Sequence, residues 1–174
     1  MTQKTMENKN DTPTSEFTIT RVFDAPRQLL WDAWTQAHRL AAWWGPKGLT
    51  MKVAKLDLRP GGTFHYSMAT PDGHEMWGKF IYHEMAPPER LVLVNSFADA
   101  EGNIVRAPFS PEWPLEVHNV ITFIESGGKT TLILKGTPIN ATEAERRMFN
   151  SFHDSMKQGF GGTFDQLAAY LAAQ

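Results

Sequence analysis

The sequence predicts an α+β protein in which a curved antiparallel sheet of about seven strands grips a long C-terminal helix. Two patterns support this fold class. Over residues 141–173, apolar side chains recur every three or four positions, which lays one stripe along a single helix. The middle of the chain instead holds strand-like segments that are separated by turn residues. Helices and strands are therefore segregated along the chain rather than alternating, which is typical of the α+β class.

The folded part of the chain is expected to begin with a strand and two short helices. Side chains alternate over residues 17–23, which predicts the first strand. Pro26 follows at a position typical of a first helical turn, and apolar residues continue a helical face as far as Trp34. A second short helix is expected at residues 38–44, and the turn-forming segment 43–48 closes it.

Six further strands are expected after these helices. Turn sequences that contain proline and glycine, such as Pro71-Asp72-Gly73, separate several of them. Because most of these connections are short, neighbouring strands should pair antiparallel as a meander. The expected strands are residues 49–58, 63–68, 74–85, 90–97, 115–124 and 129–136.

One connection is longer than a hairpin requires. Residues 98–114 contain three prolines together with Phe109 and Trp113. Long loops are often lids over a binding site, and proline limits the conformational entropy that such a loop loses when it closes. We therefore expect residues 98–114 to cover the mouth of a pocket, with Trp113 at its rim.

The C-terminal helix is the longest element expected. Unbroken, it would extend roughly 45 to 50 Å, so its apolar stripe needs a broad sheet as a partner. Asn140 or Thr142 is expected to cap its start, ahead of Glu143 and Glu145 in the first turn. The stripe consists of Phe149, Phe152, Met156, Phe160, Phe164, Leu167 and Leu171.

Three glycines, Gly159, Gly161 and Gly162, lie inside this stripe. Each should cost about 1 kcal/mol relative to alanine in a helix interior. Two arrangements would accommodate them: a continuous helix that bends where its backbone approaches the sheet, or a break into shorter helices at residues 141–158 and 163–173. The continuous, bent helix is the favoured interpretation.

Composition restricts the classes of function. The chain has 174 residues, a formal charge of -2 and a pI near 6.3, without the basic surface that nucleic acid requires. It contains no cysteine, which excludes disulfides and thiolate metal ligands. We expect residues 1–15 to be a disordered leader without a secretory signal, residues 16–174 to be one domain, and no segment to span a membrane. These features predict a cytoplasmic protein.

The sequence shows little sign of a preassembled catalytic or metal centre. Its six histidines include no HExxH pair and no two spaced for one face of a helix, so neither a metal nor another cofactor is expected. It also lacks a nucleophile elbow and a phosphate-binding loop. His153 on the C-terminal helix could direct a titratable ring into a pocket, although a histidine satisfied at the edge of the core is the simpler interpretation.

Several short motifs together resemble one protein family. In chain order they are AWT at residues 33–35, WWGP at 43–46, DLRPGG at 57–62, PPERLV at 87–92 and GGKTTL at 127–132. From about residue 17 to the C-terminus, the chain resembles the homologues of the activator of heat-shock-protein ATPase, within the START-like (SRPBCC) helix-grip superfamily. The sequence departs from that family at Gly159-Phe160-Gly161-Gly162, where the family more often has a glycine followed by tryptophan.

The resemblance implies the helix-grip (START/Bet v 1-like) fold, with a cavity between the long helix and the concave sheet for an apolar or amphipathic small molecule. It does not imply a shared catalytic set. Alternation along the strands places aromatic residues on the face towards the helix together with Tyr66 and Asn95, a mixture suited to a ligand pocket. The candidate ligand-binding residues are Trp44, Phe64, Tyr66, Asn95, Phe97, Trp113, Phe123, Phe149, Phe152, His153, Met156 and Phe160.

Three functions are compatible with these features. The first is binding of a small apolar or amphipathic molecule without catalysis. The second is an enzyme of the cyclase or dehydratase kind, which would fold its substrate in the same cavity and use His153 or Tyr66 for proton transfer. The third is a co-chaperone-like interaction module, which needs no cavity. A homodimer is compatible with all three, and no nucleic-acid partner is expected.

Overall fold

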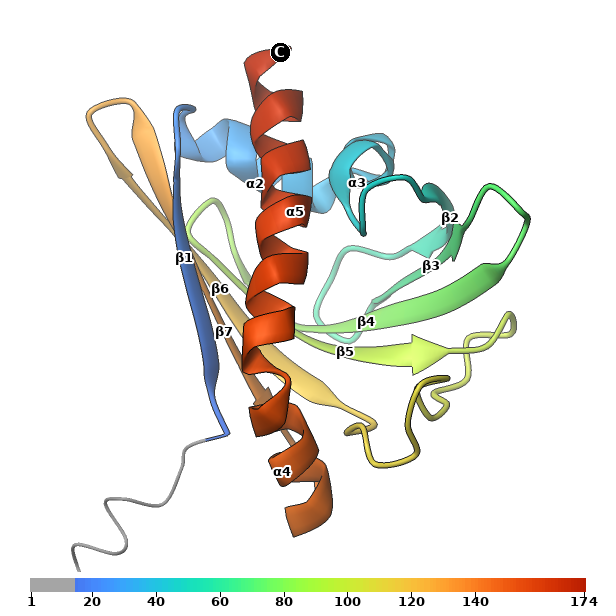
Figure 1. Ribbon diagram of the computed structural model, residues 1–174. Helices are drawn as coiled ribbons and strands as arrows, with labels where there is room; N and C mark the ends of the chain where they lie inside the picture. Colours follow the sequence, from blue (N-terminus) through green and yellow to red (C-terminus); the bar gives the residue numbers. More distant parts are fainter. Residues whose placement is uncertain (1–14) are drawn as a thin grey trace, which may run out of the picture.

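A seven-stranded antiparallel sheet forms the framework of the protein. The computed structural model describes residues 15–174, and its strands follow the order β1-β7-β6-β5-β4-β3-β2 across the sheet (Figure 1). Strands β2 to β7 form the expected meander, and β1 pairs with β7. Apart from Ser15, the predicted leader at residues 1–15 lies outside the described residues. The strands are β1 (Phe17–Phe23), β2 (Thr50–Leu56), β3 (Thr63–Ala69), β4 (Glu75–Ala86), β5 (Arg90–Ala98), β6 (Val117–Ser126) and β7 (Lys129–Pro138).

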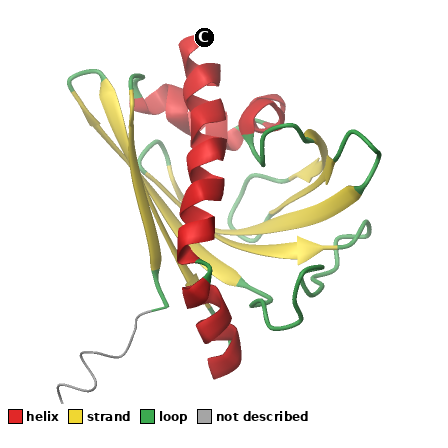
Figure 2. Ribbon diagram, viewed as in Figure 1, coloured by secondary structure: helices red, strands yellow, loops and turns green. Residues whose placement is uncertain are grey.

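In the described part of the chain, four helices accompany this sheet. Figure 2 shows the long C-terminal helix crossing the face towards which the sheet curves, with the two short helices near its C-terminal end. The helices are α2 (Arg27–Thr35), α3 (Ala37–Trp43), α4 (Glu143–Ser151) and α5 (His153–Ala172). The predicted α+β helix-grip architecture is confirmed, and the strand boundaries agree with the predicted ones to within two residues.

A capping box at Thr142 sets the start of α4. The Thr142 hydroxyl oxygen accepts a hydrogen bond from the Glu145 backbone N–H at 3.1 Å, and the Glu145 carboxylate accepts one from the Thr142 backbone N–H at 2.9 Å. This reciprocal pair satisfies two backbone donors that the start of a helix otherwise leaves free. Of the two caps expected from the sequence, Thr142 is the one used.

The C-terminal helix is interrupted at Phe152 and not at its glycines, which corrects both predicted arrangements. At Phe152 the backbone leaves regular helical geometry, with φ of -98° and ψ of 3°, and this residue separates α4 from α5. Helix α5 then continues through Gly159, Gly161 and Gly162 without a break. A Cβ atom added to any of the three would meet no neighbouring atom within 4 Å. No close approach to the sheet therefore requires these glycines.

Tryptophans of the two short helices join α5 to the sheet. Trp34 of α2 and Trp43 of α3 are almost fully buried, and their ring centroids lie 4.9 Å apart. The Trp43 indole N–H donates to the Ala33 carbonyl at 2.9 Å, which satisfies this donor inside the core. The Trp34 ring also packs against Phe123 of β6 and Phe164 of α5, with ring centroids 6.2 Å and 6.5 Å apart. These rings fasten α2, α3 and α5 to the sheet as one core.

Burial along the C-terminal helix is uneven. Phe164 and Leu167 in the second half of α5 are fully buried, and so is Phe149 in α4. Met156 and Phe160, which lie between them on the same stripe, are only half-buried. The helix therefore packs closely at its two ends and less closely in the middle.

Phe164→Ala should destabilise the protein by about 3 to 5 kcal/mol, because it removes a fully buried ring from the core. Met156→Ala should cost clearly less because Met156 is only half-buried, and Lys157→Ala on the exposed side should have little effect. Chemical denaturation of the three variants measures these differences in the free energy of unfolding. Equal losses for Phe164→Ala and Met156→Ala would contradict the uneven burial.

Candidate functional site

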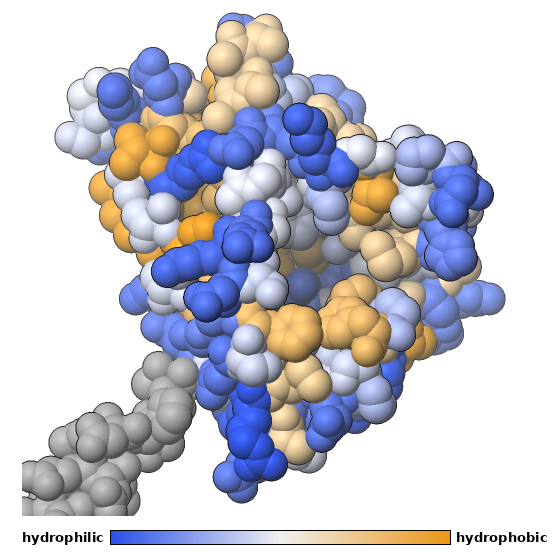
Figure 3. Space-filling view, in the orientation of Figure 1, coloured by the Kyte–Doolittle hydropathy of each residue, from blue (hydrophilic) through white to orange (hydrophobic). Residues whose placement is uncertain are grey.

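A cavity lies between the middle of the C-terminal helix and the sheet. It has a volume of about 220 Å³, and Figure 3 shows a hollow beside the helix with hydrophobic side chains on its rim. Its walls come from β3, β4, β5 and β6, from the end of the loop before β6, and from α4 and α5. The lining residues are Tyr66, Met68, Trp77, Gly78, Asn95, Ser96, Phe97, Trp113, Pro114, Val117, Asn119, Phe149, Met156 and Phe160.

A second space of about 220 Å³ adjoins the first on the side of α3. Trp44 and the turn after α3 form part of its wall. The Gly45 carbonyl in this turn accepts hydrogen bonds from Thr163 Oγ1 at 3.2 Å and from Gln166 Nε2 at 2.7 Å, which tie the turn to α5. The residues that line both spaces are Tyr66, Met68, Met156 and Phe160.

The shape of the first cavity depends on a glycine opposite Tyr66. In the register of the sheet, Gly78 of β4 lies between Tyr66 of β3 and Phe97 of β5. A Cβ atom on Gly78 would stand 2.4 Å from Tyr66 Oη, much closer than non-bonded atoms approach. The Tyr66 ring therefore lies across Gly78, and its hydroxyl group is directed from β3 towards β5.

Tyr66 presents a neutral hydroxyl group at this wall. The residue is 5% exposed, and burial raises the pKa of its hydroxyl group to about 12 because a phenolate would lose its hydration. The Trp44 side chain, whose ring centroid lies 6.5 Å from that of Tyr66, lowers this pKa by a smaller amount. The Tyr66 hydroxyl group donates to no other residue of the described range, so its proton is available for donation to a ligand.

Two asparagines form a polar part of the same cavity wall. Asn119 Nδ2 of β6 donates to the Val117 carbonyl at 3.0 Å and to Asn95 Oδ1 of β5 at 2.7 Å. Asn119 Oδ1 lies against Gly136, where an added Cβ atom would be only 3.0 Å away. Asn95 therefore has its amide oxygen engaged, whereas its Nδ2 group has no hydrogen-bond partner within residues 15–174.

The lining of both spaces lacks ionised side chains. All of the lining residues belong to the described range, and none of them is Asp, Glu, Lys, Arg or His. A charged group bound here would lose its hydration without gaining an opposite charge, which is costly. The site is therefore suited to an uncharged molecule with a largely apolar surface.

The loop between β5 and β6 places aromatic rings at the cavity mouth. Phe109 is 54% exposed and stacks on Phe152 with ring centroids 5.8 Å apart. The ring centroid of Trp113 lies 5.5 Å from those of Phe149 and Phe152. The ring centroids of Phe97 and Phe109 lie 5.8 Å apart. These contacts join the end of β5 to the junction between α4 and α5, and Trp113 itself lines the cavity.

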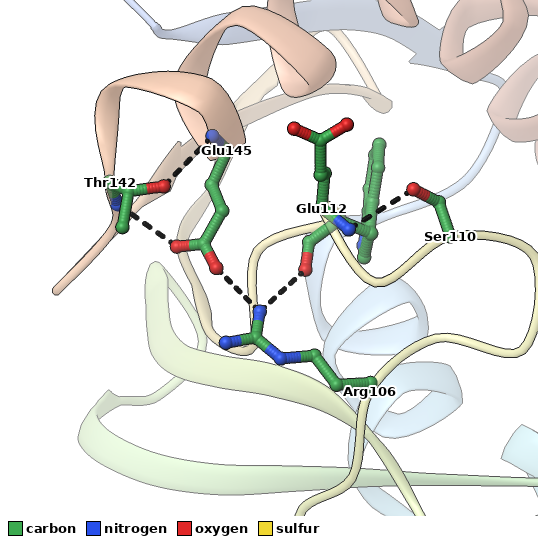
Figure 4. A network of polar contacts seen from close by, with 6 residues as sticks. Arg106, Ser110, Glu112, Thr142 and Glu145 are labelled. Atoms are coloured by element: carbon green, nitrogen blue, oxygen red, sulfur yellow. Dashed lines mark hydrogen bonds and ion pairs between the residues drawn. The ribbon is translucent and has the colours of Figure 1, made fainter.

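An ion pair fastens this loop to the start of α4 (Figure 4). Arg106 Nη1 donates to the Glu145 carboxylate and, at 3.3 Å, to the Trp113 carbonyl. Glu145 is 7% exposed and belongs to the capping box with Thr142. The hydrogen bond from the Thr142 backbone and then the one from Arg106 hold the pKa of the Glu145 carboxyl group below its usual range. One carboxylate therefore joins the helix cap to the loop.

The same loop is also held on the outer face of the sheet. His65 Nε2 lies 2.9 Å from the Asp99 carbonyl oxygen, and Lys79 Nζ donates to the Gly102 carbonyl at 2.8 Å. Within this turn, the Asp99 carboxylate accepts a hydrogen bond from the Asn103 backbone N–H at 2.8 Å. The first part of the loop is thus fixed to the outer face, while its aromatic part covers the inner face.

Most of the ligand-binding residues predicted from the sequence line one or both spaces. These residues come from α5, from α4, from strands β3 and β5, from the turn after α3 and from the loop before β6. The eight that line a space are Trp44, Tyr66, Asn95, Phe97, Trp113, Phe149, Met156 and Phe160.

Three predicted aromatic residues lie away from both linings. Phe64 is fully buried and stacks on Tyr66 with ring centroids 4.7 Å apart. Phe123 is buried in the core beneath Trp34. Phe152 faces the aromatic rings of the loop rather than the cavity. The alternation along a strand identifies the inner face of the sheet, but not which part of that face is covered by core.

His153, the fourth such residue, also lies away from both spaces. The centroid of its ring lies 5.6 Å from that of Phe17 and 5.3 Å from that of Phe149. Its Nε2 atom is buried without a hydrogen-bond partner in the described residues. Burial lowers the pKa of the imidazole because it disfavours the charged ring. His153 thus lies at the edge of the core, where the simpler interpretation of the sequence placed it, but its Nε2 atom lacks the hydrogen bond that this interpretation expected.

Several lining residues were missed by the sequence reasoning. Asn119 was detectable, because it shares a strand face with Ile121 and Phe123. Gly78 has no such signal, since only the register of β3 with β4 reveals that it faces Tyr66. The missed residues are Gly45, Pro46, Met68, Trp77, Gly78, Ser96, Pro114, Val117, Asn119, Gly159 and Thr163.

The polar chemistry of the site comes from Tyr66 and the two asparagines. Among the described residues, no group of three or more His, Cys, Asp or Glu side chains is placed to hold a metal ion. In the same range, no helix combines the length and the apolar character needed to cross a membrane.

A curved antiparallel sheet that closes on a C-terminal helix around an apolar cavity defines a helix-grip domain. Residues 24–172 match the family model described as Activator of Hsp90 ATPase homolog 1-like protein. The chain belongs to this family, which confirms the resemblance inferred from its motifs. None of the curated proteins matches the sequence.

Solved structures share the fold over most of the chain. Protein Ms6760 from Mycobacterium smegmatis is 28% identical, with a TM-score of 0.75 and 92% of each chain covered. A protein from Arthrobacter aurescens is 24% identical, with a TM-score of 0.77 over 92% of this chain and 88% of that one. The AHSA1 protein from Silicibacter pomeroyi is 19% identical, with a TM-score of 0.68 over 91% and 98% of the two chains. The latter two similarities show the fold alone.

Gly78→Ala should destabilise the protein by about 1 to 3 kcal/mol, because the added methyl group forces the buried Tyr66 ring out of its place. Chemical denaturation measures this cost. In a Tyr66→Leu background the same substitution should cost much less, because leucine lacks the atoms that the methyl group would meet. An equal cost in both backgrounds would show that Gly78 is required for another reason.

Glu145→Gln should reduce the free energy of unfolding at neutral pH but not in acid. Because its contacts lower the pKa of Glu145 in the folded state, their contribution is present above the unfolded-state value of about 4.5 and is lost as the pH falls through the folded value. Urea denaturation of wild type and variant over a pH series measures the difference. Glu143→Gln, which changes an exposed carboxylate in the same turn, should have a smaller effect. A Glu145→Gln loss that stays constant into strong acid would refute the ionic contribution.

Proposed function

We propose that the protein binds a small apolar or amphipathic molecule in the cavity between α5 and the sheet, without catalysing a reaction. The observation that carries this proposal is the composition of the wall. Aromatic and methionine side chains supply the apolar area, while Tyr66 and Asn95 supply a few polar groups. Ligand sites in proteins combine these two features, because apolar area contributes affinity and polar groups fix orientation.

The dimensions of the site support a small ligand. An apolar cavity of about 150 Å³ is large enough to hold benzene, so each space of about 220 Å³ has room for a somewhat larger molecule. The two spaces share Tyr66, Met68, Met156 and Phe160 as lining residues. A ligand that extends along these four side chains could occupy both.

The loop before β6 supports the same proposal. Phe109 is largely exposed although it is a large apolar ring, and Trp113 is only half-buried while it lines the cavity. Aromatic rings at the rim of a pocket gain contacts when a ligand binds. The loop is thus arranged to contribute to a bound state more than to the core.

Catalysis in the cavity has less support than binding. Tyr66 has a pKa of about 12, so it is a weak acid and is not ionised to act as a base near neutral pH. His153, the other residue considered for proton transfer, lies against Phe17 and Phe149 outside the lining. A co-chaperone-like interaction module is the remaining alternative, and it would not require a ligand.

Native mass spectrometry of gently purified protein tests the proposal. A small molecule that is retained in the folded state and released on denaturation supports it. Protein that carries no such molecule and binds none of a panel of neutral aromatic compounds would contradict it and favour the interaction module.

Trp113→Ala should weaken the binding of the neutral dye N-phenyl-1-naphthylamine by about 1 kcal/mol or more, because an aromatic wall of the site is lost. The melting temperature should change little, since Trp113 is half-buried at the mouth. Fluorescence titration and thermal melts measure the two effects. Trp31→Ala is the control: Trp31 is 6% exposed in α2, so its loss should lower the melting temperature and leave dye affinity nearly unchanged. The reverse pattern for Trp113→Ala would mean that the loop belongs to the core.

A further inference from the structure

We propose that the ligand is uncharged and carries a hydrogen-bond acceptor, such as a carbonyl oxygen, which receives hydrogen bonds from the Tyr66 hydroxyl group and the Asn95 side-chain amide. This inference rests on the proposed function and adds the chemical class of the ligand. It follows from which polar atoms at the cavity wall already have partners and which do not.

The orientation of the Asn95 amide is determined by its neighbours. The Val117 carbonyl oxygen can only accept a hydrogen bond, so the side-chain atom of Asn119 that lies 3.0 Å from it must be the donor Nδ2. The same Nδ2 group lies 2.7 Å from Asn95, which must therefore present its oxygen to Asn119. The Nδ2 group of Asn95, with its two N–H donors, remains without a partner in the described residues.

The Tyr66 hydroxyl group is a second donor on the same cavity. It donates its proton to no other residue of the described range, so the O–H proton is available to another acceptor. Because the ring crosses Gly78, the hydroxyl group stands above β4 and is directed towards β5, the strand that carries Asn95. Neighbouring strands lie only about 4.8 Å apart. In the register of the sheet Asn95 lies opposite Phe80, two positions along β4 from Gly78, so it is a diagonal neighbour of that glycine. Both donors also line the same cavity, and the proposal places the ligand acceptor between them.

The donors of Tyr66 and Asn95 favour a ligand with a neutral carbonyl group over a hydrocarbon and over a carboxylate. A hydrocarbon would fill the apolar space but leave both donors desolvated and unpaired, which is unfavourable. A carboxylate would satisfy the donors, but the lining has no cationic side chain to replace its lost hydration. A neutral carbonyl group satisfies the donors without bringing a charge into the cavity.

Three naphthalenes of similar shape test this inference. The probes are 2-acetylnaphthalene, its isosteric alkene 2-isopropenylnaphthalene, and 2-naphthoate, and their dissociation constants are measured by quenching of tryptophan fluorescence or by calorimetry. Tyr66→Phe and Asn95→Leu should each weaken binding of the ketone by about three- to tenfold, the range for one lost hydrogen bond. Neither variant should weaken binding of the alkene, and 2-naphthoate should bind wild type more weakly than the ketone.

Tyr82→Phe is the matched control for the loss of a tyrosine hydroxyl group. The Tyr82 hydroxyl group is buried without a partner in the described residues, and Tyr82 lines neither space. Its removal should leave the affinities for all three probes unchanged. Thermal melts establish that each variant is folded, and Tyr66→Phe retains the test even if Asn95→Leu does not fold.

The outcomes separate the ligand class from the proposed function. In one outcome, alkene and ketone both bind while neither Tyr66→Phe nor Asn95→Leu selectively weakens binding of the ketone. That result would overturn the inference that the ligand carries an acceptor for these two residues, while the cavity would remain a binding site. Tightest binding of 2-naphthoate would overturn the preference for an uncharged ligand. Failure of wild type to bind any of the three would overturn the inference and count against the proposed function as well.

Discussion

The structure depends on how one long helix meets a curved sheet. Phe164 and Leu167 press the second half of α5 into the core, and Phe149 does the same for α4. A helix cannot follow the curvature of a sheet along its whole length, so close packing at both ends leaves space in the middle, where Met156 and Phe160 lie. The cavity is thus a consequence of the architecture. No close approach to the sheet requires the helical glycines, because a Cβ atom added at any of the three would meet no neighbouring atom within 4 Å.

The chemistry of that space is set by the sheet instead. Gly78 removes one side chain from the inner face, and Tyr66 of the neighbouring strand occupies the position that this leaves. A tyrosine that reaches over the next strand brings its hydroxyl group towards Asn95, although the two residues are far apart in the sequence. Asn119 then donates a hydrogen bond to the side-chain oxygen of Asn95, whose Nδ2 group has no partner among residues 15–174. The site therefore presents donors in an otherwise apolar wall.

Periodicity in the sequence was sufficient to predict the elements but not their contacts. The apolar alternation of the strands and the stripe of the C-terminal helix correctly identified the fold and the inner face, and they placed Tyr66 and Asn95 among the lining residues, although other lining residues were missed. The same alternation could not separate Phe64, which is covered by core, from Tyr66 two positions later. Gly78 matters only through the register of two strands, which is a long-range property. The break and the close approach to the sheet expected at the helical glycines were both wrong, because helix propensity carries little weight when Phe164 and Leu167 are packed into the core.

The anchors of the loop before β6 have a kinetic consequence. Residues near Asp99 and Gly102 are fixed to the outer face of the sheet by His65 and Lys79, so an opening motion would involve only the segment that follows them. Within that segment, Ile104 forms a β-bridge with Ala98 at the end of β5. The part that follows is held by the Arg106 ion pair and by contacts between aromatic rings, and its release leaves the pairing between the seven strands intact. Entry and exit of the proposed ligand would then occur at the rate of a loop motion, which is far faster than the unfolding of a domain.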